Sequence, residues 1–138
     1  MFYEVMKNIV NEIVKEVSGW NGVSSYPHRF GGTEFRFGKP ELGHIHRNGL
    51  TDIPFPMKIR DELIKENIVH PHHILPETGW ISFYVREDKD KETAIKLFRL
   101  SYLRYSIKRT ENNSQLKDEI DQMNISEEIR SIYLNMFR

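Results

Sequence analysis

The spacing of apolar residues changes along this chain, and that change limits the folds open to it. Between residues 2 and 18 apolar side chains recur at helical spacing, which predicts an amphipathic helix. Between residues 33 and 37 the pattern is a strict alternation that places Phe35 and Phe37 on one side, as in a half-buried strand. Helical and strand periods within one short chain favour a mixed architecture.

Further segments extend this mixed pattern. Extended patterns predict additional strands at residues 23–30, 41–47, 51–55 and 80–86. Helical spacing predicts further helices at residues 57–67, 91–108, about 116–123 and 127 onward, the last of them capped by Ser126. Hairpin-linked strands with flanking helices predict an α+β fold, a small antiparallel sheet with helices packed on one face. No linker divides the chain, so we expect one domain over residues 1–138, with a helical extension over about residues 110–138.

Composition narrows the classes of function. The chain has 20 basic and 20 acidic residues, so it lacks the global positive field that drives non-specific nucleic-acid binding. It has no cysteine, which excludes disulfides, thiolate metal sites and cysteine nucleophiles. The first residues do not resemble a signal peptide, and no apolar run approaches the ~20 residues that span a bilayer. We therefore expect a cytoplasmic protein that does not enter the membrane.

The alternation also identifies a polar face opposite the expected core. Because side chains alternate along a strand, Ile45 points away from His44 and His46, and Ile81 points away from Trp80 and Ser82. If the strands are neighbours in register, one face of the sheet carries Glu34, Arg36, His44, His46, Trp80, Ser82 and Tyr84. A carboxylate, a guanidinium, imidazoles and aromatic rings together are typical of a pocket for a small ligand, with an anion as one candidate.

All six histidines lie between His28 and His73. On a strand, His44 and His46 place two imidazoles on one side about 6.5–7 Å apart at the backbone, within reach of one metal ion. The run from His70 to His73 offers further nitrogens, and Glu34, Glu41 or Asp52 could complete a site suited to Zn, Fe or Mn. Histidines that act as hydrogen-bonding or acid–base groups without a metal, and histidines that are merely solvated, are the two alternatives.

Two further residues each have a functional and a structural interpretation. Asp52 either stabilises the turn after Asn48-Gly49 or orients an imidazole, as carboxylates beside metal ligands do. Trp80 is either a wall for a planar ligand or an aromatic anchor in the core. No serine lies in a G-x-S-x-G elbow, and no glycine-rich phosphate loop is present, so catalytic residues and a reaction stay unassigned.

Several short motifs together resemble one protein family. These motifs are Phe-Gly-Gly-Thr-Glu-Phe at 30–35, Glu-Leu-Gly-His-Ile-His at 41–46, Asp-Ile-Pro-Phe at 52–55 and Gly-Trp at 79–80. Over roughly residues 20–106 the chain resembles the uncharacterised bacterial and fungal family called "luciferase domain", a name that does not establish light emission. The resemblance implies a site at His44, His46, Asp52, His73 and Trp80. The alternation of side chains along the strands adds Glu34 and Arg36, which lie on the same polar face.

A more distant similarity is to the MmcQ/YjbR-like fold. The shared order is a short helix, a loop, a strand that begins at Trp80, and a helix carrying Ser101-Tyr102. This resemblance implies a double-wing arrangement, whose members are often labelled DNA-binding. The helix at 91–108 carries a basic stretch that would either bind DNA or form a solvated surface. Its residues are Lys96, Arg99, Arg104, Lys108 and Arg109. A DNA- or protein-binding module is therefore the alternative function, and the histidine face as a homodimer interface is a third hypothesis.

Overall fold

An antiparallel sheet forms the centre of this computed structural model, which describes residues 2–109 and 113–137. Within that part of the chain six strands pair in the order β1-β2-β3-β4-β6-β5, and every pairing is antiparallel. The strands are β1 Val23–His28, β2 Gly32–Phe37, β3 Glu41–Ile45, β4 Leu50–Pro54, β5 His70–Pro71 and β6 Trp80–Tyr84. The predicted α+β fold is confirmed.

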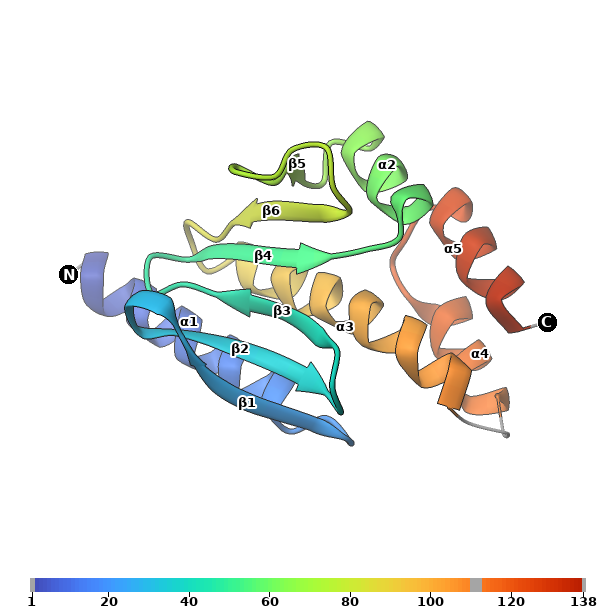
Figure 1. Cartoon of the computed structure of the whole chain (residues 1–138), viewed down its shortest axis with the longest axis horizontal. Coiled ribbons are helices and arrows are strands. Elements are labelled where there is room, and N and C mark those ends of the chain that lie inside the picture. The colour runs from blue at the N-terminus through green and yellow to red at the C-terminus, as the bar shows by residue number, and fades with distance from the viewer. Residues whose placement is uncertain (1, 110–112, 138) are drawn as a thin grey trace.

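The helices cover one face of this sheet and one end of it. They are α1 Phe2–Ser18, α2 Met57–Lys65, α3 Asp90–Arg109, α4 Ser114–Gln122 and α5 Glu127–Leu134, with short 3-10 helices η1 Arg29–Gly31 and η2 Asn135–Phe137. Figure 1 shows α1 and α3 behind the sheet and α2, α4 and α5 gathered at one end. The core joins the helices to the apolar sides of the strands, among them Ile13, Leu97, Phe35, Ile45, Ile53 and Ile81. Within the described part of the chain, no helix lies on the opposite face of the sheet (Figure 1).

Helix α3 is buried on several sides. Leu100 and Leu103 are fully buried, whereas Ile95 and Tyr105 are half-buried. The reason is that α3 lies between the sheet, α1 and the C-terminal helices, and the Tyr133 hydroxyl on α5 donates to the carbonyl of Leu100 at 2.7 Å. Among the described helices, none is long and apolar enough to cross a membrane.

An irregularity in β3 decides which side chains reach the open face. Pairing with β2 runs from Phe35 opposite Gly43 to Arg36 opposite Glu41, so β3 contains one extra residue at Leu42. The side chain of Leu42 is buried in the core. A Cβ on Gly43 would also point into the core, toward Phe98 and Ile53. Such a bulge puts Glu41 and His44 on the same face, although residues three apart in a regular strand lie on opposite faces.

The segment predicted as a loop before Trp80 contains the two-residue strand β5. His70 pairs with Ser82 and Pro71 pairs with Ile81 on β6. This pairing holds the start of the segment at the edge of the sheet, so that the next two residues, His72 and His73, lie near the strand β4.

Candidate functional site

One register row crosses the whole sheet on its open face. Residues directly opposite each other in antiparallel strands share a face. The pairings join Tyr26 to Glu34, Glu34 to His44, His44 to Asp52, Asp52 to Ser82 and Ser82 to His70, in a row of polar and aromatic side chains. The row therefore brings together groups from all six strands, and Asp52 lies near its middle.

Asp52 is the centre of the cluster. It is only 1% exposed, and its Oδ2 lies 3.2 Å from Nε2 of His44 and 3.2 Å from Nε2 of His46. The Nε2 atom of His73 lies 3.5 Å from the same oxygen. Three imidazole nitrogens therefore face one oxygen of a buried carboxylate. A buried charge of this kind is stable only when it is paired, and these rings supply the pairing.

The other oxygen of Asp52 is held by different groups. The Ser82 hydroxyl donates to Oδ1 at 2.7 Å, and Nε2 of His72 faces the same atom at 3.6 Å. Nδ1 of His72 accepts the backbone N–H groups of Ile74 and Leu75 at 3.1 and 3.0 Å, so the neutral ring carries its hydrogen on Nε2. The N–H at Nε2 of His72 therefore faces Asp52, and this nitrogen has no lone pair to offer to an ion.

Two more carboxylates orient rings of the cluster from outside. Nδ1 of His44 donates to Oε2 of Glu41 at 2.7 Å, which the bulge in β3 makes possible. Nδ1 of His28 bonds to Oε1 of Glu34 at 3.1 Å, and the ring of His28 stacks on His44 with centroids 3.8 Å apart. Arg36 donates to the other oxygen of Glu34 at 2.8 Å. Each carboxylate fixes a ring through Nδ1 and directs its Nε2 inward.

Burial and pairing shift the acidities of these groups in opposite directions. Burial alone would lower the pKa of His44, but hydrogen bonds to Asp52 and Glu41 raise it to about 9. Burial would raise the pKa of Asp52, yet hydrogen bonds from His44 and Ser82 hold it well below its usual range. Burial lowers the pKa of His46 and of His72, and the positive charge of nearby histidines adds to this effect. Without a bound ion, the raised pKa of His44 keeps this ring doubly protonated at neutral pH.

The raised pKa of His44 predicts that the metal-free protein loses stability in mild alkali. A group whose pKa is higher in the folded state stabilises the fold fully below its ordinary value of 6.5, and this stabilisation is lost as pH rises through about 9. We expect the free energy of unfolding to fall on the order of 2 kcal/mol between pH 6.5 and 9.5. Urea unfolding with a chelator present measures this decline, and Glu41→Gln should make it shallower. An equally steep decline in that variant would contradict the assignment to His44.

The structure brings most of the predicted site residues together. His44, His46, Asp52 and His73 meet at one carboxylate, and Trp80 lies at their edge, its ring 5.5 Å from that of His44. Glu34 joins through His28, whereas Arg36 is half-exposed and reaches the cluster only through Glu34. Two contributors, Glu41 and His72, were considered only as additional metal ligands, and two others, His28 and Ser82, were not among the predicted site residues. The strand pattern did place Ser82 on this face, and the alternation of Tyr26 with His28 was an available signal for His28.

The basic stretch on α3 is largely engaged within the molecule. Arg99 makes a two-point ion pair with Glu119 at 2.6 and 2.7 Å, and Lys96 donates to the carbonyl of Asn124 at 2.9 Å. Arg104 donates to the carbonyl of Pro54 at 2.8 Å. The side chain of Arg109 lies outside the described residues. These bonds attach α3 to its neighbours, and DNA binding through this helix stays a prediction.

Comparison with family models tests the resemblance seen in the sequence. Residues 39–101 match the family model described as Luciferase domain. The resemblance seen in the sequence is thus confirmed for that segment. The matched segment contains every residue that faces the Asp52 carboxylate. His28 and Glu34 precede it. No curated protein and no solved structure gives a match, so the more distant double-wing resemblance stays a prediction.

Proposed function

We propose that the open face of the sheet binds one divalent transition-metal ion through Nε2 of His44, His46 and His73 and Oδ2 of Asp52. The observation that supports this most strongly is the set of distances from Oδ2 to the three nitrogens, 3.2, 3.2 and 3.5 Å. An ion about 2.1 Å from each of four tetrahedral ligands holds those ligands about 3.4 Å apart. The three distances therefore match the three edges of a coordination tetrahedron that meet at Oδ2.

The surrounding hydrogen bonds fit the same role. Glu41 binds Nδ1 of His44, as the carboxylates behind metal-ligating histidines do, and this bond leaves Nε2 for the ion. Ser82 and His72 both face Oδ1 of Asp52 and leave Oδ2 directed at the three rings. Buried charged groups are weak evidence of a purely stabilising role, because replacing them by apolar residues often leaves stability unchanged or raises it. The orientation of these side chains therefore fits a binding role better than a purely stabilising one.

The donor set and its exposure indicate the chemistry. Three imidazoles and one carboxylate, with no thiolate, suit Zn²⁺, Fe²⁺ or Mn²⁺. The side chain of His73 is 34% exposed, so the cluster is open to solvent on that side. A small ligand that enters there would meet the ring of Trp80, which lies 5.5 Å from His44 and 6.0 Å from His72 between ring centroids. To act as a Lewis acid on that ligand, an ion held by the four protein groups would have to accept an oxygen of the ligand as a fifth donor.

Calorimetric titration of the chelator-treated protein tests this proposal. We expect Zn²⁺ to bind with one ion per chain, and Mn²⁺ and Fe²⁺, titrated without oxygen, to bind more weakly in the order Mn²⁺ below Fe²⁺ below Zn²⁺. Zn²⁺ at 100 times its dissociation constant should stabilise the fold by about 2.7 kcal/mol, measured as a rise in the unfolding temperature. The absence of saturable binding by all three ions would contradict the proposal.

A further inference from the structure

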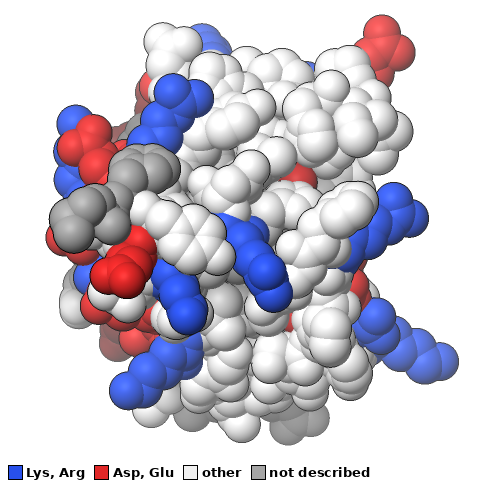
Figure 2. Space-filling model, turned by 90° about the vertical axis from the view of Figure 1, so that its left-hand side faces the viewer, with Lys and Arg blue, Asp and Glu red and all other residues white. Residues whose placement is uncertain are grey.

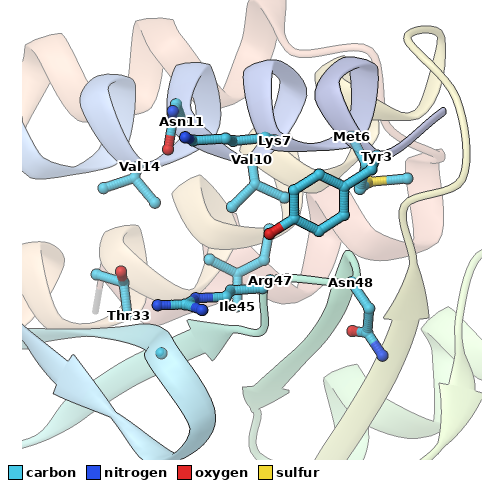
Figure 3. A pocket seen from close by; sticks show the side chains of 11 residues that line it. Tyr3, Met6, Lys7, Val10, Asn11, Val14, Thr33, Ile45, Arg47 and Asn48 are labelled. Carbon is cyan, nitrogen blue, oxygen red and sulfur yellow. The ribbon is translucent and has the colours of Figure 1, made fainter. Parts of the chain in front are cut away.

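A second concave site lies on the other face of the sheet, between α1 and the ends of β2 and β3. Figure 3 shows this cleft with the helix above it and the strands below. Its volume is about 590 Å³, within the range of small-molecule sites. The cleft and the histidine cluster lie on opposite sides of β3, because Ile45 lines the cleft while His44 and His46 face the cluster. The two sites therefore have no lining residue in common.

A run of apolar side chains follows the length of the cleft, with the polar Asn11 and Thr33 beside it. One side of α1 contributes Met6, Val10 and Val14, which follow each other at helical spacing, and β3 contributes Ile45 below them. The ring of Tyr3 closes one end, where Figure 3 shows it beside Met6 and above Arg47. An apolar trough of this form suits the hydrocarbon part of a ligand, since burying such a chain removes apolar surface from water.

The polar groups of the cleft have one sign of charge. Lys7 and Arg47 line it, and among the described lining residues there is no carboxylate. Neither cation has an ion-pair partner within the described part of the chain, whereas Arg36, Lys91 and Arg99 are each paired with a glutamate. In Figure 3 both side chains extend toward the same side of the cleft, Lys7 from above and Arg47 from below.

The backbone leaves room for one of these cations. Gly31 has φ +77°, and a Cβ there would collide with the guanidinium of Arg47. The absent side chain therefore lets Arg47 lie over the β1–β2 turn at the cleft. Figure 2 views the end of the molecule where α1 begins, and basic side chains project there among uncharged and acidic ones.

We propose that this cleft binds a single-chain organic anion, such as a fatty acid, with its carboxylate between Lys7 and Arg47 and its hydrocarbon chain along Met6, Val10 and Ile45. Charge complementarity selects the head group, because two unpaired cations face a site without a carboxylate. The apolar trough selects the chain. Binding of this kind needs both parts of the ligand, and this requirement separates it from adsorption of a detergent or of a simple anion.

Nuclear magnetic resonance titration tests the proposal with four probes and with chelator present, so that the histidine cluster stays empty. The probes are decanoate, decanol, decyltrimethylammonium and acetate, each below any micelle-forming concentration. We expect decanoate alone to bind saturably and to shift amide signals of α1 and of residues 45–48. Equal binding by decanol, or binding by decyltrimethylammonium, would overturn the role of the two cations. Absence of saturable decanoate binding would overturn the proposal as a whole.

Paired variants separate the cleft from general surface charge. Lys7→Met/Arg47→Met should weaken decanoate binding about tenfold, equivalent to about 1.4 kcal/mol. Lys15→Met/Lys39→Met removes the same charge at exposed positions that do not line the cleft, and it should leave the affinity unchanged. All four positions are exposed, so both proteins should fold, which the spectra of the free proteins report directly. Equal weakening in the two variants would contradict the assignment.

Discussion

Replacing His46 by alanine, or Asp52 by asparagine, is expected to lower the affinity for Zn²⁺ by more than about 100-fold. Loss of a group behind a metal ligand already costs about 10–100-fold; His46→Ala would remove a proposed ligand outright, and Asp52→Asn would remove the negative charge of another. Each change leaves the fold with its main core, since His46 is half-buried and asparagine matches aspartate in shape. Calorimetry on chelator-treated proteins measures the loss.

His70→Ala is the matched control for that experiment. His70 lies on the same face in the same register row, but it is exposed and its ring contacts Tyr84 rather than Asp52. It should keep the wild-type affinity for Zn²⁺. If His70→Ala weakened binding as much as His46→Ala, the ion would be bound by surface histidines in general and not by the cluster around Asp52.

Gly43→Ala is expected to destabilise the fold by about 3 kcal/mol. Gly43 has φ +143°, a conformation that alanine adopts only under strain, and its Cβ would lie 2.9 Å from the Asp52 carbonyl and 2.9 Å from Cε1 of Phe98. Backbone strain of about 1–3 kcal/mol adds to a similar term for overpacking. Because the bulge at Leu42-Gly43 also positions Glu41, the variant should bind Zn²⁺ more weakly as well.

Urea unfolding measures this change, with Gly19→Ala as its control. Gly19 follows α1, and a Cβ there meets only ordinary contacts, at 3.5 Å or more, without a positive φ. It should change the free energy of unfolding by no more than about 0.5 kcal/mol. A Gly43→Ala protein as stable as Gly19→Ala would show that β3 tolerates a regular strand at this point.

The faces of the strands could be predicted because a sheet covered on one side imposes a period of two. That period places Phe35 and Ile45 in the core and leaves His44 and His46 on the open face, as the structure shows. The identity of the central residue could not be predicted in the same way. Asp52 becomes central only because β4 lies between β3 and β6, and strand order depends on long-range packing that one sequence does not reveal.

Two parts of the cluster depend on local irregularities rather than on periodicity. Glu41 shares a face with His44 only through the bulge in β3. His72 is oriented by two backbone N–H groups of the turn that follows it, a geometry that residue types do not specify. His28 does follow the alternation with Tyr26, but it is the last residue of β1, and the stacking of its ring on His44 depends on strand order. Period-two patterns describe regular strands, so they fail where a strand bulges or ends.

Diffraction from crystals saturated with Zn²⁺, recorded on both sides of the zinc absorption edge, tests the metal site most directly. The site predicts one anomalous peak per chain, about 2.0–2.2 Å from Nε2 of His44, His46 and His73 and from Oδ2 of Asp52. Another group of candidate ligands, formed by Glu62, Glu66 and Glu128, provides the comparison. A peak at those glutamates with none at the histidine cluster would contradict the proposed function.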